Sequence, residues 1–397
     1  MKRMTGTISR GVRAPVFRAG DDVAKIVVDS VLACSQAENA PIRDRDIVAV
    51  TEAVVARAQS NYAGIGQIAK EVAAKFPSGE IALVFPILSR NRFATCLRGI
   101  AAGLRKIHLV LAFPSDEVGN HLFDPAKLID TDIDPWRDTL DEATYRAAFG
   151  YDLHPFTGID YVAYYLDLIR DGGCEADVHF TNRVERALDF APDVLVCDIH
   201  TRAKSKRALQ KAGARTVFGL EDLLTAPVDG SGYNAEYGLL GSNKATEDTV
   251  KLFPRDPQPI VDAIQAGLLA ATGRHVEVMV YGDGAFKDPV GKIWELADPV
   301  VSPAFTAGLN GTTNELKLKY LADNQFANLS GEALAKAIRE RIQEKGADLK
   351  GSMESQGTTP RRLTDLIGSL CDLTSGSGDK GTPIVWIQGY FDTYAAE

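Results

Sequence analysis

The chain has 397 residues, of which 45% are hydrophobic and 24% charged, and a formal net charge of -9 at pH 7. This balance is that of an ordinary soluble globular protein, and it argues against a protein that binds nucleic acid or an anionic membrane surface. The length favours two domains, or one domain with a large insertion. The five cysteines are scattered without C-x-x-C spacing, which argues against a disulfide framework and a structural zinc site. No apolar run reaches the roughly 18 residues of a membrane span, so we expect a cytoplasmic protein.

The first 77 residues predict a helix and then a strand–helix unit. Gly20-Asp21-Asp22 is a helix-start signal, and the apolar residues after it recur at helical spacing, so a helix should begin near Asp21. Residues 47–50 form a short apolar run that predicts a strand, and 52–58 predict a helix directly after it. Thr51, Glu52 and Arg57 therefore follow a strand end, where α/β proteins place ligand contacts.

The middle of the chain has a different pattern of apolar and polar residues. Short apolar runs at 81–85, 106–113, 193–199 and 215–220 alternate with helical or irregular segments, a pattern typical of βα units around a mostly parallel sheet. We therefore predict an α/β protein in which an inserted α/β domain, residues 78–232, interrupts a core formed by residues 1–77 and 233–397.

The last third of the chain contains the first candidate ligand. An alternating run from Val276 to Tyr281 predicts a strand, and it ends in Gly282-Asp283-Gly284. Two glycines let the backbone turn sharply or approach a ligand closely, so Asp283 is either a binding residue or an ordinary turn residue. An amphipathic helix around 363–373 and a final strand at 383–388 follow.

Three motifs have competing interpretations. The run 376–381 spells G-x-G-x-x-G, but a helix precedes it and a strand follows, which is the reverse of a dinucleotide fingerprint. It is therefore a phosphate-wrapping loop or a plain connection. The histidines lack metal-ligand spacing, and His108 within a strand is more typical of a core residue. Cys197 and His200 are three residues apart at a strand end, which disfavours a Cys/His nucleophile pair.

The remaining chemistry is that of oxygen ligands. Carboxylates and cations are interleaved in the last third, and such sets serve Mg²⁺- or Mn²⁺-assisted phosphoryl transfer, although each residue alone could be a surface charge. The carboxylates are Asp283, Asp288, Glu295, Asp298, Glu315, Asp365 and Asp372, and the cations are Lys287, Lys317, Arg361 and Arg362.

Five stretches occur in the order that is typical of one family. They are APVFRAGDDVAKIV, DRDIVAVTEAVVARAQ, YGLLGSNKATEDTVKLFPRDPQP, the strand with Asp283, and TTPRRLTDLIGSLCDLTSGSGDKGTPIVWIQG. Together they resemble the coenzyme F420:L-glutamate ligase (γ-glutamyl ligase) family over about residues 8–65 and 235–392, with 78–232 as an insertion relative to the short archaeal enzymes. The resemblance implies a homodimeric, GTP-dependent amide ligase that uses a divalent metal, Mg²⁺ or Mn²⁺, and an acyl phosphate. Its substrates would be L-glutamate and a small-molecule carboxylate acceptor.

The same resemblance implies roles for particular residues. The implied nucleotide contacts are Pro15, Val16, Phe17, Arg18, Glu52, Ala53, Ser375, Gly376, Ser377 and Gly378. Asp283 and Asp365 match two aspartates that hold a metal ion, and Arg57 and Lys287 are the cations that we assign to catalysis beside the phosphates. The chain departs from the family pattern at Leu366, where a second metal carboxylate is expected, in the Gly-Ser run of the loop, and in the residues after Asp283.

These departures leave two other hypotheses open. One is a non-catalytic homologue that binds a nucleotide or metabolite. The other is a ligase with a different acceptor, for instance a folate-like carboxylate.

Overall fold

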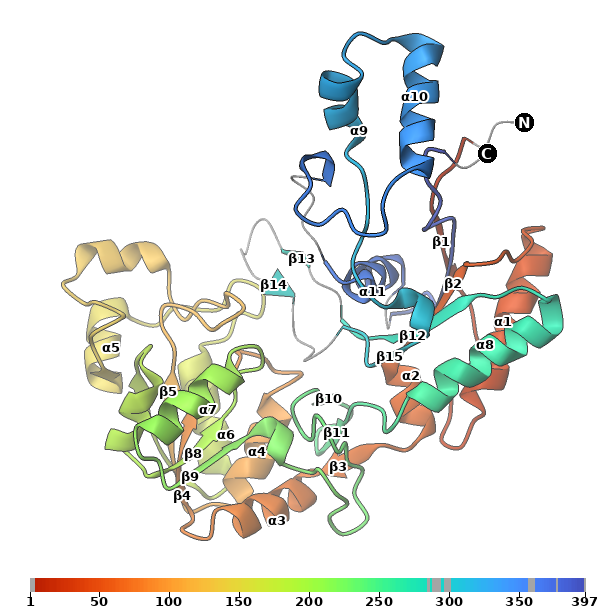
Figure 1. Cartoon of the computed structure of the whole chain (residues 1–397). Coiled ribbons are helices and arrows are strands. Elements are labelled where there is room, and N and C mark those ends of the chain that lie inside the picture. The colour runs from red at the N-terminus through yellow and green to blue at the C-terminus, as the bar shows by residue number, and fades with distance from the viewer. Residues whose placement is uncertain are drawn as a thin grey trace.

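The structure is a computed structural model that describes residues 4–283, 286–287, 294–295, 301–355, 361–375 and 378–395. Both ends of the chain build one five-stranded sheet, the core sheet (Figure 1). Its strands are, in spatial order, β1 (Ile8–Val12), β16 (Ile384–Gln388), β2 (Ile47–Thr51), β12 (Glu277–Tyr281) and β15 (Ala304–Phe305). The central pair β2 and β12 is parallel, and the other neighbours are antiparallel. The carboxyl ends of β2 and β12 therefore lie at the same edge.

Alternation along the strands gives the core sheet two buried faces. Val48 and Val50 lie on the face covered by α1 (Val23–Ala37) and α8 (Gln258–Thr272). Ile47 and Ala49 lie on the opposite face, against α11 (Leu363–Thr374). The predicted helix near Asp21 is confirmed as α1, because the Asp22 side chain accepts a hydrogen bond from the Lys25 amide and caps it.

The inserted region forms a second, six-stranded sheet, the insert sheet. Its order is β6 (Leu140–Asp141), β7 (Glu175–Phe180), β5 (Lys106–Leu111), β4 (Glu80–Val84), β8 (Asp193–Val196) and β9 (Thr216–Gly219). All pairs except β6–β7 are parallel, which confirms the prediction of a mostly parallel sheet. In chain order the five parallel strands follow the 3-2-1-4-5 arrangement of doubly wound α/β folds.

Helices cover both faces of the insert sheet (Figure 1). The helices of this region are α3 (Ile65–Lys75), α4 (Ala94–Ala102), α5 (Glu142–Phe149), α6 (Tyr161–Asp171) and α7 (Arg202–Lys211). Residues of α3, α4 and α6 bury one face together with Leu83 and Leu109, whereas Leu209 of α7 packs on the other face with Val84 and Val196.

The unit around the insert sheet is wider than the predicted range 78–232. Its hydrophobic cluster also contains residues of α3 and reaches Leu252 on the other side. A hairpin of β10 (Asn243–Lys244) and β11 (Thr249–Lys251) pairs with β3 (Tyr62–Gly64) and connects the two sheets. The predicted boundaries therefore fall inside one packed cluster. The sequence shows where the pattern of apolar and polar residues changes, but it does not show which neighbouring element a helix packs on.

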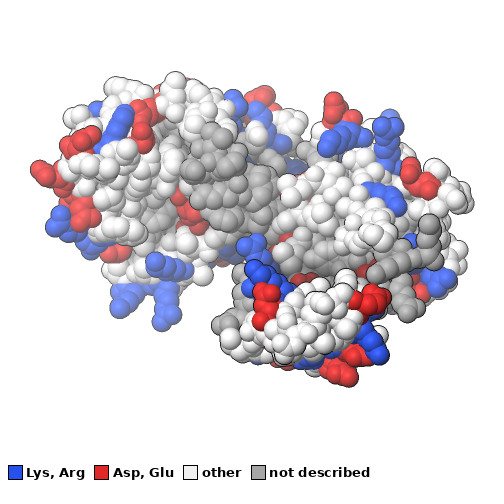
Figure 2. All heavy atoms as spheres, turned by 90° about the horizontal axis from the view of Figure 1, so that it is seen from above, with Lys and Arg blue, Asp and Glu red and all other residues white. Residues whose placement is uncertain are grey.

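Three further features complete the fold. The short helix α9 (Leu318–Tyr320) and α10 (Gly331–Gln343) project away from both sheets (Figure 1), and two short strands, β13 (Phe286–Lys287) and β14 (Trp294–Glu295), pair with each other. On the face seen in Figure 2, basic and acidic side chains are intermingled. Within the described residues, no helix is long and apolar enough to cross a membrane.

Candidate active site

A cavity of about 900 Å³, the core cavity, opens at the carboxyl ends of β2 and β12. Four parts of the chain line it: the loop after β1, the start of α2 (Glu52–Ala58), the β10–β11 hairpin, and the ends of β12 and α11 with the loop into β16. The edge where parallel strands end is the usual ligand-binding position in α/β sheets, because loops and helix N-termini converge there.

Most of the implied nucleotide contacts meet in this cavity. Those that line it are Pro15, Val16, Phe17, Glu52, Ala53, Arg57, Ser375 and Gly378. Arg18 is not among the lining residues. Gly376 and Ser377 lie outside the described residues, and so does the side chain of Lys287.

The loop after β1 is fastened to α2. Arg57 Nε donates a hydrogen bond to the Phe17 carbonyl oxygen at 2.7 Å, and the Gly20 amide donates to the Ala58 carbonyl oxygen at 2.8 Å. Val16 remains 78% exposed. Arg57 thus positions a wall of the cavity, a role that the sequence did not suggest.

Among the residues that the structure describes, two aspartates line the core cavity, Asp283 after β12 and Asp372 near the end of α11. Asp365, the predicted partner of Asp283, lies in the first turn of α11 and does not line the cavity. Seven residues are two helical turns, so Asp365 and Asp372 lie on similar faces of the helix about 10 Å apart along its axis. The Leu363 amide donates to Gly311 O and so holds the first turn, whereas the opposite end continues into Ser375 at the cavity. Asp283 and Asp372 therefore line the same cavity, whereas Asp365 does not.

Tyr281 supports the acidic side of the cavity. Its side chain is buried beside Asp372 and Ser375, and burial raises the pKa of its hydroxyl above the usual range, with Cys371 and Asp372 adding to the effect. Ser375 is itself buried and donates to Thr382 Oγ1 at 3.1 Å. The phenol is therefore a neutral group that fixes the start of the glycine-rich loop against the end of β12.

Two cations that the sequence did not single out form ion pairs with carboxylates that line the core cavity. Lys251 of β11 forms an ion pair with Glu52, and both side chains are nearly buried. Arg92, from the loop between β4 and α4 of the insert, forms an ion pair with Asp283. Both pairs join segments far apart in the chain, so local pattern could not reveal them.

The donors of the core cavity suit a hard divalent cation, since the carboxylates of Asp283 and Asp372 are oxygen ligands of the kind that Mg²⁺ and Mn²⁺ prefer. Ser375 and Thr382 hydroxyls and the backbone of a glycine-rich loop lie on the same wall, as a phosphate group requires. The residues present therefore fit a nucleotide that carries a divalent metal ion.

Another group with metal-ligand chemistry lies away from the core cavity, on β5 and β7. His108 Nδ1 and His179 Nε2 both contact Asp177 Oδ1, at 2.7 and 2.9 Å. Glu80 binds His108 Nε2 at 3.1 Å, and Lys106 pairs with Asp177. Although burial lowers it, the pKa of His108 is raised overall by hydrogen bonds to Asp177 and Glu80. The members of this cluster are held together by hydrogen bonds and by the ion pair with Lys106. The prediction that His108 is a buried strand residue is confirmed.

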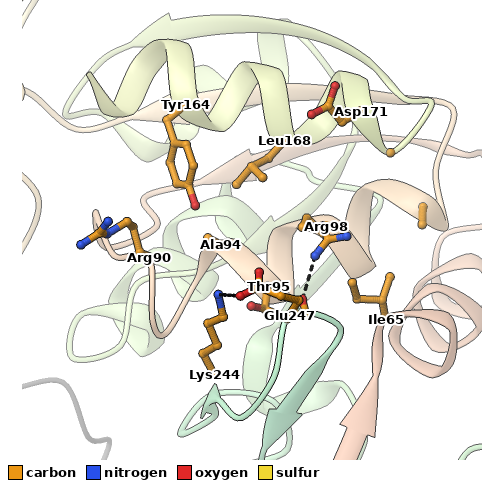
Figure 3. Close-up of a pocket in the computed structure, with 12 residues that line it drawn as sticks. Ile65, Arg90, Ala94, Thr95, Arg98, Tyr164, Leu168, Asp171, Lys244 and Glu247 are labelled. Atoms are coloured by element: carbon orange, nitrogen blue, oxygen red, sulfur yellow. Dashed lines mark hydrogen bonds and ion pairs between the residues drawn. The ribbon is translucent and has the colours of Figure 1, made fainter. Parts of the chain in front are cut away.

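A second cavity of about 470 Å³, the insert cavity, lies between α4, α6 and the β10–β11 hairpin (Figure 3). Tyr164 of α6 and Arg98 of α4 point toward the hairpin residues Lys244 and Glu247, and Arg90 lines the same cavity with its guanidinium turned away from them. Lys244 pairs with Glu247 at 2.7 Å, and Arg98 donates to the Glu247 carbonyl oxygen at 2.7 Å. Because Lys244 lines both cavities, the hairpin is the wall between them.

The insert sheet also has a strand edge where a ligand could bind, between the ends of β4 and β8 where the strand order reverses. Only about 20 Å³ remains there, and its lining is mostly apolar: Ile87, Arg92, Phe93, Cys197, Ile199, Leu220, Leu239, Leu240 and Ser242. The amides of 199–201, at the start of α7, already donate to the carboxylate of Glu117. The insert crevice is therefore filled, and Cys197 is a buried thiol whose pKa burial raises well above its usual value.

Comparison with known proteins identifies the family of the chain. A profile of the F420-0:Gamma-glutamyl ligase family matches residues 11–389. A search of curated proteins found no match. Because the matched range covers nearly the whole chain, the protein belongs to the F420-0:γ-glutamyl ligase family.

Proposed function

We propose that this ligase is GTP-dependent and joins L-glutamate to the carboxylate of a small acceptor through an acyl phosphate, with Mg²⁺ or Mn²⁺ bound to the nucleotide. The observation that carries the proposal is the content of the core cavity. Asp283, Asp372 and the wall of Ser375 and Thr382 meet at the carboxyl ends of β2 and β12. This is the position and the donor chemistry that a metal-bound nucleotide requires.

The proposed reaction has two steps. A carboxylate oxygen of the acceptor attacks the γ-phosphorus of GTP, the bond from this phosphorus to the bridging oxygen breaks, and GDP leaves with that electron pair. The amine of glutamate then attacks the acyl carbon, phosphate leaves with the electron pair of the acyl carbon–oxygen bond, and the nitrogen loses a proton to water. An enzyme accelerates such a sequence mainly by alignment and by neutralising phosphate charge.

Named residues would divide this work. Asp283 and Asp372 would hold the metal ion, which neutralises charge on the phosphates when bound. Gly378 and its neighbours would surround the phosphates with backbone amides, and Arg57 would keep the Phe17 wall in place for the rest of the nucleotide.

The acceptor would approach from the insert cavity. This cavity adjoins the core cavity at Lys244 and combines apolar walls, such as Leu168, with the cations Arg90 and Arg98. An acceptor with an apolar body and negative groups fits such a lining. The homodimer that the resemblance implies remains a prediction.

The test is phosphate release from GTP, measured with glutamate and F420-0, the acceptor in the family's name, and in parallel with small-molecule extracts of cells. We expect release that requires both glutamate and an acceptor, with one amide product formed per phosphate, identified by mass spectrometry. GTP binding without release under any of these conditions would overturn the ligase proposal in favour of a non-catalytic binding protein. Release with an extract fraction but not with F420-0 would keep the ligase and change its acceptor.

A further inference from the structure

The insert crevice is a strand-end site that no longer has room for a ligand. In doubly wound sheets, the loop after the first strand turns into a helix and often carries the phosphate contacts. Here the corresponding loop, between β4 and α4, seals the crevice with Ile87 and Phe93. Two of its arginines contact other parts of the molecule: Arg90 lines the insert cavity, and Arg92, which also borders the crevice, forms an ion pair with Asp283 in the core.

The loop is held rigidly enough to aim Arg92. The buried Tyr165 hydroxyl donates to Ile87 O at 2.8 Å and accepts from the Ser89 amide at 2.8 Å. The Arg92 amide donates to Ser89 Oγ at 3.1 Å, and Cys96 Sγ lies 3.3 Å from Arg92 O. A side chain on a backbone fixed at this many points is preorganised for its contact.

Asp283 lines the core cavity, and Arg92, which borders the insert crevice, reaches it from the insert. The Arg92 side chain is 12% exposed and that of Asp283 is 35% exposed, so the carboxylate still faces the cavity while the guanidinium lies mostly behind it. A guanidinium is a planar fork that binds carboxylate and phosphate oxygens alike. The same side chain can therefore hold Asp283 in the unliganded protein and a phosphate when one is present.

We propose that Arg92 brings the inserted domain into the phosphoryl-transfer step: it holds Asp283 in the unliganded protein and binds the phosphoryl group once metal-bound GTP fills the core cavity. The proposal rests on the proposed function for its second half only. Two consequences follow for the free protein and for turnover. Arg92 competes with a divalent cation for Asp283 before the nucleotide binds, and it stabilises the charge of the transferring phosphoryl group afterwards.

The test uses Arg92→Met, which removes the charge but keeps most of the length, and Arg92→Lys, which keeps the charge but not the fork. Arg105→Met is the matched control, because Arg105 is an exposed arginine of the same domain that pairs with Glu80. Two quantities are measured: the affinity for Mn²⁺ without nucleotide, from the electron paramagnetic resonance of free Mn²⁺, and the rate of phosphate release from GTP.

We expect Arg92→Met to bind Mn²⁺ about tenfold more tightly, since a competing cation is gone, and to release phosphate about 10²-fold more slowly. Arg92→Lys should lie between the wild type and Arg92→Met in both quantities, and Arg105→Met should match the wild type. If the affinity for Mn²⁺ and the rate of phosphate release both fall in Arg92→Met, the residue has a merely structural role and the proposal is overturned. No change in either quantity would also overturn it. If the wild type releases no phosphate under any condition, the proposed ligase fails, but the Mn²⁺ result still decides whether Arg92 competes for Asp283.

Discussion

The core sheet and the insert sheet both have a strand edge at which a ligand could bind. Side chains fill this position at the insert sheet and leave it open at the core sheet. Each sheet has parallel strands whose carboxyl ends could bind a ligand. At the core sheet the loops leave a cavity of about 900 Å³ whose lining includes carboxylates and hydroxyls beside apolar residues, whereas at the insert sheet mostly apolar side chains leave about 20 Å³. The topology thus provides a place for a ligand, and the side chains of the loops decide whether it is used.

The difference also explains what the insert contributes. Its own crevice is closed and the anion position at the start of α7 is taken by Glu117, so it does not resemble an independent nucleotide-binding domain. Its Arg90 lines the insert cavity, and its Arg92 forms an ion pair with Asp283 of the core cavity. We interpret the insert as a wall of the ligase site.

The largest effect is expected at the filled insert crevice, where a variant tests the difference between the two sheets. Leu239 is 1% exposed and packs there, so Leu239→Ala should lower the free energy of unfolding by about 2–5 kcal/mol through lost burial and a new cavity. Chemical denaturation measures the loss, and a calorimetric titration of GTP checks the site. The affinity for GTP should not change, and a second GTP site in the variant would contradict the view that the insert crevice has no phosphate-binding function.

A smaller effect is expected at the hairpin that separates the cavities. Lys251→Met leaves the nearly buried carboxylate of Glu52 without its ion-pair partner, which should cost about 2–4 kcal/mol of unfolding free energy. The double variant Glu52→Gln/Lys251→Met should recover most of this loss, because no uncompensated charge remains. If thermal denaturation shows the double variant to be as unstable as the single one, the pair is not the cause.

The smallest effect is a pH dependence in the insert. Burial raises the pKa of Asp198 to about 6, and its Oδ1 has no hydrogen-bond partner in the described part of the chain. The folded state therefore binds more protons than the unfolded state between about pH 4 and 6, and the stability from this group falls as pH rises through that window. Asp198→Asn should match the wild type near pH 4 and exceed its stability by about 1–3 kcal/mol near pH 7.

The control is at the opposite end of the same strand, β8, which begins at Asp193 and ends just before Asp198. The Arg215 guanidinium holds the pKa of Asp193 down to about 2, so this carboxylate stabilises the fold above its unfolded pKa and loses that contribution as pH falls toward 2. Asp193→Asn should consequently become less stable than the wild type at neutral pH. Urea unfolding of the wild type and both variants from about pH 2 to 8 measures both effects. The Asp193 contribution should change below about pH 4 and the Asp198 contribution between about pH 4 and 6, with opposite signs, and equal signs would refute the assignment.

Much of the fold could be predicted because its signals are local. The helix predicted at 52–58 is α2 in the structure, since Thr51 ends a buried strand and its hydroxyl accepts from the Ala53 amide at the start of the helix. Asp283 could be placed at a ligand cavity for the same reason, because an alternating run ends beside it. The domain boundaries were less accurate, since α3 packs on the insert although it precedes the change in texture.

The acidic partner and the insert's cation could not be predicted. Asp365 and Asp372 lie two turns apart on similar faces of α11, and periodicity identifies a face but not which end of a helix reaches a cavity. Arg92 meets Asp283 only because the β4 loop and the end of β12 approach in three dimensions. No motif around Arg92 distinguishes it from a surface arginine.

The central claim is that the nucleotide and its metal ion bind in the core cavity at Asp283 and Asp372. Calorimetric titration of GTP with Mn²⁺ into the wild type, Asp283→Asn/Asp372→Asn, Asp365→Asn and Asp198→Asn tests it most directly. We expect the first variant to bind roughly 10²-fold more weakly, as loss of metal ligands requires, and the other two to keep wild-type affinity. Unchanged affinity in Asp283→Asn/Asp372→Asn, or a loss confined to Asp365→Asn, would contradict the account.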